Sequence, residues 1–124
     1  MSALPAGIVA QHSEIARLIA EVRRSHAQGA SWDALARMLD GLIEVVRQHF
    51  ESEQDEMKTA SYPLLVEHSA NHDTFLRRLK VLRAECDRRE TELMSVFMDL
   101  LDNWFKNHER TADQLVLDHL ASQR

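Results

Sequence analysis

The stretch WDALARMLDGLIEVVRQHFESE, residues 32–53, repeats side chains suited to burial at alternating steps of three and four residues. The members of this stripe are apolar at first and ionisable at the end: Trp32, Leu35, Leu39, Leu42, Val46, His49 and Glu53. Because such spacing keeps side chains on one face of an α-helix, the stretch predicts an amphipathic helix. That face would be apolar along most of its length and polar near its end.

Three further segments carry stripes with the same period. Gly29 followed by Ser31, and Tyr62 followed by Pro63, mark two helix boundaries, since glycine ends helices while serine and proline begin them. We therefore expect helices over residues 7–27, 31–59, 63–87 and 91–109. A short C-terminal helix or tail is expected around Leu115, Val116 and Leu120.

Four amphipathic helices joined by short connections bury their stripes most directly as antiparallel neighbours. We predict an all-α fold, an up-down-up-down four-helix bundle, formed by residues 1–124 as a single domain. The composition agrees with this fold. Three glycines and two prolines leave few residues for the tight turns of a β-sandwich or barrel.

Composition and charge also limit the surroundings of the protein. With 44% hydrophobic and 28% charged residues, the chain is typical of soluble globular proteins. Its formal net charge of -5 argues against nucleic acid or an anionic membrane as a partner. The single cysteine, Cys86, and the lack of a signal segment or membrane span predict a cytoplasmic protein.

Six ionisable residues occupy stripe positions where leucine is expected: His12, His49, Glu53, His68, His72 and His108. One such histidine alone is usually a hydrogen-bonded core residue. Six of them need an organised partner, because burying uncompensated polar groups is costly, and bound metal is the obvious one. In an antiparallel bundle all six fall at the same end, and four of the histidines form one layer.

Asp113 adds a seventh residue from beyond the last long helix. It follows His108 by five residues, a spacing that a regular helix would rotate away from the cluster, so we expect the helix to loosen or end there. Five imidazoles and two carboxylates suit iron, zinc, copper or nickel better than calcium or magnesium. Two carboxylates among five histidines suggest two bridged ions, and so few anionic donors favour reversible oxygen binding over oxygen splitting.

The order of these residues resembles the hemerythrin family: His12, His49-Phe50-x-x-Glu53, His68-x-x-x-His72 and His108-x-x-x-x-Asp113. Neighbouring residues agree with it, namely Gln11 before His12, Met57 after the glutamate, Tyr62-Pro63, and Trp104 four residues before His108. The resemblance covers nearly the whole chain. His26 and His119 match no ligand position, and we expect them to be solvated.

The resemblance implies a non-haem di-iron centre with an oxo or hydroxo bridge. In it, His68, His72 and His108 would hold one iron and His12 and His49 the other, with Glu53 and Asp113 bridging both. Dioxygen would bind end-on at the second iron, be reduced to a hydroperoxide and leave unchanged. The implied oxygen pocket comprises Ile15, Phe50, Trp104, Phe105 and Glu109; the family usually has an apolar residue where Glu109 stands.

The leading interpretation is thus a bacterial oxygen carrier, storage protein or sensor, a binding protein more than an enzyme, and a monomer or weak homo-oligomer. The alternative is a di-iron enzyme or iron-handling protein that reduces peroxide or nitric oxide or repairs iron centres. A bundle with purely structural zinc is a third reading. Seven ligands are more than the four that close a structural zinc site.

Overall fold

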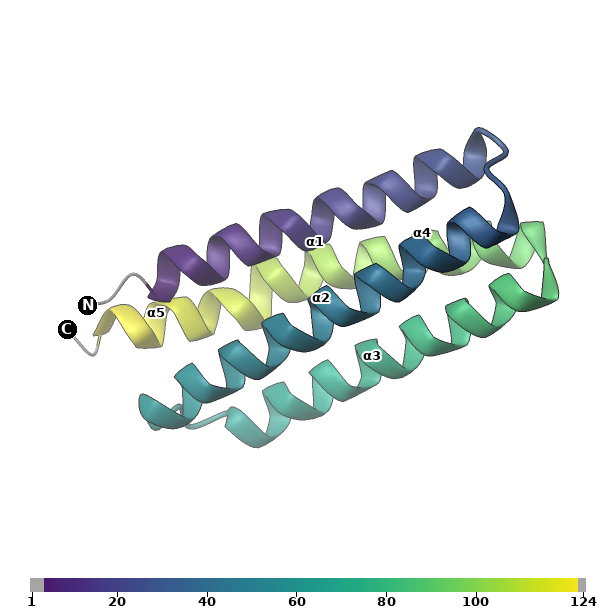
Figure 1. Cartoon of the computed structure of the whole chain (residues 1–124). Helices are drawn as coiled ribbons and strands as arrows, with labels where there is room; N and C mark the ends of the chain where they lie inside the picture. Colours follow the sequence, from purple (N-terminus) through teal and green to yellow (C-terminus); the bar gives the residue numbers. More distant parts are fainter. Residues whose placement is uncertain (1–3, 123–124) are drawn as a thin grey trace.

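The computed structural model describes residues 4–122, with the side chains of residues 11–122. Within this range the chain forms α1 (Leu4–Ala27), α2 (Trp32–Thr59), α3 (Leu65–Arg88) and α4 (Thr91–His108). A π-helical segment, η1 (Glu109–Asp113), continues α4 into the short helix α5 (Gln114–Ser122). Successive long helices run in opposite directions (Figure 1), which confirms the predicted all-α four-helix bundle with a short C-terminal helix.

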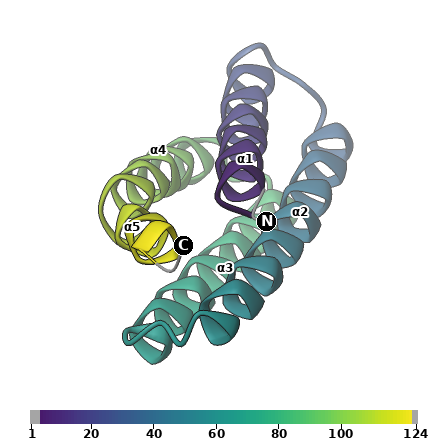
Figure 2. The same cartoon turned by 90° about the vertical axis from the view of Figure 1, so that its left-hand side faces the viewer.

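The four long helices stand in a ring, as the view along the bundle shows (Figure 2). α1 packs against α2 and α4, and α3 packs against the same two helices. Each helix therefore has two neighbours, which gives every apolar stripe a partner surface.

Two of the connections follow from the residues that punctuate them. Gly29 has a φ of 79°, the left-handed conformation that ends many helices. Ser31 then caps α2, because its hydroxyl oxygen accepts a hydrogen bond of 3.1 Å from the backbone N–H of Ala34. The predicted start of the third helix at 63 is two residues early. Pro63 still lies in the turn between α2 and α3, and α3 begins at Leu65.

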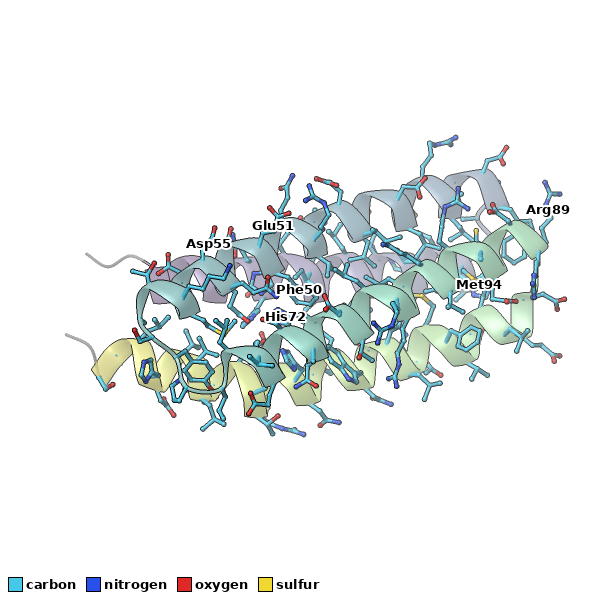
Figure 3. All side chains as sticks on the ribbon, turned by 90° about the horizontal axis from the view of Figure 1, so that it is seen from below. Phe50, Glu51, Asp55, His72, Arg89 and Met94 are labelled. Carbon is cyan, nitrogen blue, oxygen red and sulfur yellow. The ribbon has the colours of Figure 1, made fainter. Side chains whose placement is uncertain are left out.

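The ionisable side chains lie between two apolar clusters. The larger cluster fills the rest of the bundle and includes fully buried Ile19, Leu39, Leu79 and Met94. The smaller one closes the other side: Met57, Tyr62 and Val116, with Leu65 and Leu120 packed against them. In Figure 3, Phe50 and His72 lie together inside the bundle, far from Arg89 and Met94 at the opposite end.

The π-helical segment determines where Asp113 points. In a regular α-helix a residue five positions after His108 would lie about 140° around the axis from it. The wider turn of η1 brings Asp113 back toward His108, and the two side chains are in contact. The helix thus loosens without ending, as the spacing of His108 and Asp113 predicts.

Candidate metal centre

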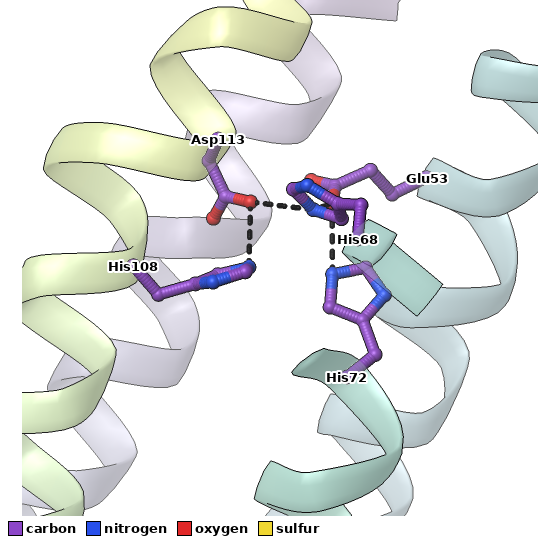
Figure 4. Close-up of side chains that lie close together, drawn as sticks. All are labelled: Glu53, His68, His72, His108 and Asp113. Atoms are coloured by element: carbon purple, nitrogen blue, oxygen red, sulfur yellow. Dashed lines mark hydrogen bonds and ion pairs between the residues drawn. The ribbon is translucent and has the colours of Figure 1, made fainter. Parts of the chain in front are cut away.

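The seven ionisable residues singled out from the sequence all lie in one buried cluster. They come from α1 to α4 and from η1, and none is more than 5% exposed: His12, His49, Glu53, His68, His72, His108 and Asp113. Five of them are drawn in Figure 4, where they converge from α2, α3, α4 and η1. Each of the five histidines in this cluster turns its Nε2 atom toward a carboxylate.

The ligand atoms form two groups that share a carboxylate. Atoms within 4.8 Å of one another belong to Glu53, His68, His72, His108 and Asp113 in the first group, and to His12, His49 and Glu53 in the second. We call these the three-histidine group and the two-histidine group. They coincide with the division of histidines that the family resemblance implies.

Glu53 lies between the two groups. Its Oε1 atom is 2.6 Å from Nε2 of His68 and 3.0 Å from Nε2 of His72. Its Oε2 atom is 3.5 Å from Nε2 of His12 and 3.6 Å from Nε2 of His49. One carboxylate therefore presents one oxygen to each group of histidines.

Asp113 repeats this arrangement from the other side. Its Oδ1 atom is 2.9 Å from Nε2 of both His68 and His108, and its Oδ2 atom is 2.9 Å from Nε2 of His12. Two carboxylates placed in this way have the disposition of bridging ligands between two cations.

The carboxylates hold protons on two of the histidines when no metal is bound. Burial lowers the pKa of His12, but the close contacts with Asp113 and Glu53 outweigh it and raise this pKa to about 9. The pKa of His68 rises to about 9 from the same balance. Burial raises the pKa of both carboxyl groups, but the surrounding imidazoles outweigh it and hold each pKa well below its usual range.

His49 and His72 behave differently from His12 and His68. Burial, with smaller electrostatic effects, lowers the pKa of His49 to about 4. It also lowers the pKa of His72. These two imidazoles are neutral at physiological pH, and a neutral imidazole is the form that binds a metal ion.

Buried atoms without hydrogen-bond partners test whether a metal fits. Seven side-chain atoms of the centre are buried and lack a partner with hydrogen-bond geometry. One is Nδ1 of His72, and the other six are Nε2 of His12, His49, His72 and His108, Oε2 of Glu53 and Oδ1 of Asp113. Leaving such atoms unpaired costs free energy, and cations between these six would satisfy them. The residues present therefore fit a metal, and their nitrogen and oxygen donors suit a first-row ion.

Two polar residues lie behind the two-histidine group. Oε1 of Gln11 is 2.7 Å from Nδ1 of His49, and Oε2 of Glu109 is 3.4 Å from Nδ1 of His12. Such contacts orient an imidazole so that Nε2 faces the metal. The side chain of Glu109 is 41% exposed, so it lies at the rim of the centre between His12 and solvent.

The residues expected around an oxygen pocket are divided between the two groups. Ile15 and Phe105 are buried, and the edge of Phe105 faces His12 with ring centroids 6.1 Å apart. Phe50 stacks on His72 at 3.7 Å, and Trp104 stacks on His108 at 4.7 Å. Trp104, although expected in the pocket, therefore lies against the three-histidine group.

Three neighbours of the centre were not singled out as site residues from the sequence. Gln11 contacts His49, Phe75 stacks on Trp104 at 4.6 Å, and Tyr62 meets His68 edge-on at 6.4 Å. Phe75 is fully buried in the larger apolar cluster. The contact of Gln11 joins residues 38 positions apart, so only the packing of α1 on α2 reveals it.

The expectation that His26 and His119 are solvated is wrong. Both are half-buried. His119 lies with Nε2 2.8 Å from the backbone carbonyl oxygen of Ala60, because α5 returns to the turn after α2. His26 packs on Trp32 with ring centroids 6.0 Å apart. Neither belongs to the metal-ligand groups found within the described residues.

For the metal-free protein we expect the free energy of unfolding to fall by a few kcal/mol as pH rises from about 6.5 to about 9. Because the pKa of His12 and His68 is about 9 when folded and near 6.5 when unfolded, the folded chain keeps protons that the unfolded chain releases. This stabilisation is complete below pH 6.5 and lost above pH 9. Urea unfolding of the metal-free chain across this range measures it; a flat or rising curve would contradict the charge assignment.

A cluster of five imidazoles and two carboxylates with unpaired donor atoms, buried inside a four-helix bundle, defines a helical metal-binding protein. A sequence profile described as the Hemerythrin HHE cation binding domain matches residues 5–120. The chain therefore belongs to the hemerythrin family. Within residues 4–122, no helix has the length and apolar character needed to cross a membrane.

Three curated proteins illustrate the relationship. A bacteriohemerythrin of Methylococcus capsulatus is 28% identical over 105 residues, which cover 85% of this chain and 79% of the relative. A bacteriohemerythrin of Clostridium acetobutylicum is 24% identical over 106 residues, 85% of this chain and 82% of the relative. A myohemerythrin of Sipunculus nudus is 32% identical over 78 residues, 63% of this chain and 59% of the relative. No solved structure gave a significant match.

Proposed function

We propose that the chain binds two iron ions in this centre and takes up and releases dioxygen at the ion held by His12 and His49. The observation that carries this proposal is the inequality of the two ligand groups. One gathers three histidines and two carboxylates, whereas the other gathers two histidines and one carboxylate. An ion with fewer protein ligands keeps a position open for an external molecule, as metal sites that bind substrates do.

The carboxylates support a pair of ions. Glu53 and Asp113 each direct one oxygen to each group, so both would bridge the ions, together with an oxo or hydroxo group. Bound iron supplies electrons that dioxygen takes up and returns. The carboxylates of the chain balance the charge of the ions inside a buried site, where uncompensated charge is expensive.

Residues around His12 and His49 would keep the open position ordered and dry. The side-chain oxygen of Gln11 accepts a hydrogen bond from Nδ1–H of His49 in the tautomer that leaves Nε2 for iron. Ile15 and Phe105 are at most 1% exposed, and Phe105 faces His12. These apolar side chains would exclude water, which otherwise promotes the irreversible oxidation of bound iron by dioxygen.

This chemistry serves oxygen transport, storage or sensing, and the two bacteriohemerythrins among the relatives favour a bacterial host. We place the protein in the cytoplasm, where the free, buried Cys86 stays reduced. In this proposal the protein is a binding protein and dioxygen is its small-molecule partner.

One observation favours a second function, that of a di-iron enzyme or iron-handling protein. Glu109 reaches from solvent to within 3.4 Å of Nδ1 of His12. A carboxyl group there can deliver a proton to a reduced oxygen species at the two-histidine group and favour its release as peroxide. A centre that consumes peroxide or nitric oxide would use the same proton path.

Anaerobic reconstitution with ferrous iron separates the two functions. We expect about two irons per chain, a visible absorption band on exposure to air, and loss of that band when oxygen is removed, over repeated cycles. Irreversible oxidation during the first exposure, with no reversible band, would overturn oxygen carriage and favour the enzyme. Zinc-loaded protein is the matched control, because it has the same ligands but cannot change oxidation state.

A further inference from the structure

One face of the bundle, formed by α3 and α4, exposes most of the large apolar side chains found at the surface. Seven such residues are exposed among the described side chains, and four of them lie on this face. They are between 43% and 56% exposed: Val81, Leu93, Val96 and Leu100. We call these four residues and the groove beside them the α3–α4 face.

The groove runs along the junction of the two helices. Its volume is about 520 Å³, and its lining is apolar except for one arginine: Arg78, Val81, Phe97, Leu100, Leu101 and Trp104. The ridge of α4 that carries Val96 and Leu100 forms one edge of this groove, because Leu100 is among the residues that line it. A surface with a ridge next to a groove can pair with a copy of itself, because a two-fold axis places each ridge in the other groove.

Two other junctions of the bundle carry ion pairs at the surface. Arg23 of α1 contacts Asp99 and Asp102 of α4 at 2.6 and 2.9 Å. Arg83 of α3 contacts Asp40 of α2 at 2.8 Å. Among the described residues, no ion pair joins α3 to α4. The α3–α4 face thus combines exposed apolar side chains with a lack of charged cross-links, as expected for a surface that another protein covers.

Charge placement along the face fits a second copy. Glu92 lies at the start of α4, and Arg78 lies beside the groove near Trp104, about 18 Å further along α4. Both side chains are exposed, and neither forms an ion pair within the described chain. A two-fold axis across the middle of α4 would reverse the helix and bring Glu92 of one copy toward Arg78 of the other at both ends.

We propose that the α3–α4 face is a homodimer interface with this two-fold symmetry. Four half-exposed apolar side chains form a patch no larger than the roughly 300–600 Å² of the largest patch on a typical monomer. Stable interfaces bury about 800 Å² per partner, so the dimer is weak and exchanges with monomer. Pairing would cover Trp104, whose inner face stacks on the candidate metal ligand His108, but dimer formation does not require metal.

Sedimentation velocity from low micromolar to near-millimolar concentration tests the interface. We expect the mass of the wild-type chain to rise from 14.3 kDa toward twice that value. Leu100→Glu and, independently, Val96→Glu should raise the dissociation constant at least about tenfold. Val66→Glu is the matched control, because Val66 is 77% exposed near the start of α3 and should not affect the dimer.

A charge exchange tests the two-fold geometry itself. Arg78→Glu and Glu92→Arg should each weaken the dimer, because each places like charges opposite one another, and the double variant should recover much of the affinity. Circular dichroism verifies that every variant is folded. A wild-type chain that stays monomeric throughout, or a dimer unaffected by Leu100→Glu and Val96→Glu, overturns the interface. Failure of the double variant to recover affinity overturns the two-fold arrangement.

Discussion

Replacing His72 with alanine should reduce iron content from the proposed two ions per chain to one or fewer and lower the melting temperature of the loaded protein. His72 gives the three-histidine group one of its Nε2 atoms, which lies 3.0 Å from Glu53 and has no hydrogen-bond partner. A metal that binds only the folded state stabilises it by about 4 kcal/mol when present at 1,000 times its dissociation constant. Much of this stabilisation is lost with the ligand.

The same substitution also removes a packed ring, so two forms of the protein must be compared. The ring of His72 stacks on Phe50 at 3.7 Å with an interplanar angle of 1°. Loss of this contact destabilises the metal-free protein too. We expect the difference between loaded and metal-free melting temperatures to shrink in His72→Ala, and likewise in His49→Ala, as measured by calorimetry with iron analysis.

His26→Ala is the control for these experiments. His26 is a half-buried histidine outside both ligand groups, so its removal should leave iron content and the loaded-minus-free difference unchanged. If His72→Ala still held two tightly bound irons at undiminished stability, His72 would not be a ligand. An iron-free His26→Ala protein would show that the histidines have been divided wrongly.

Glu109→Ile should lengthen the life of the oxygen-loaded protein several-fold before it oxidises to the ferric form. The carboxylate of Glu109 lies 3.4 Å from Nδ1 of His12 and is 41% exposed, so it connects the two-histidine group to solvent. It can hold water at the rim and supply a proton to the departing oxygen species. Isoleucine provides neither, so the decay rate should also depend less on pH.

Glu109→Gln distinguishes water from proton transfer. Glutamine has nearly the same shape and keeps a polar rim, but it cannot release a proton. If proton delivery limits the decay, Gln and Ile variants should both be long-lived; if water entry limits it, only the Ile variant should be. Decay followed in the visible spectrum at equal rates in all three proteins, from acid to neutral pH, would place Glu109 outside the reaction.

The fold and the composition of the centre follow from the period of the sequence. Stripes such as the one from Trp32 to Glu53 fix which face of each helix is buried. Antiparallel packing then fixes which end each ionisable residue occupies. The five-residue spacing of His108 and Asp113 even predicts a departure from regular helix, because the carboxylate must turn inward for its burial to be satisfied.

Other features depend on how the helices pack against one another, which the period of the apolar stripes does not specify. Trp104 lies four residues before His108 on α4, so the period predicts their contact, but only the packing of the helices decides that Phe105, about 100° around α4 from Trp104, meets His12. His119 contacts Ala60 because α5 packs against the turn between α2 and α3, and the spacing of residues in the sequence does not predict where α5 packs. Pro63 suggested an earlier start of α3 because proline suits both a turn and a first helical position.

The π-helical segment joins α4 and α5 into one continuous helix whose winding changes at η1. At the end of η1, Asp113 contacts His108 inside the cluster. Beyond it, α5 contacts the α2–α3 turn, because His119 lies against the backbone carbonyl of Ala60. If η1 became a regular α-helix, α5 would rotate about the helix axis by about 100° for each residue by which its register shifted. Val116 would then leave the apolar cluster around Met57 and Tyr62. The conformation of η1 therefore determines both the contacts of Asp113 with the histidines and the rotation of α5 about its axis.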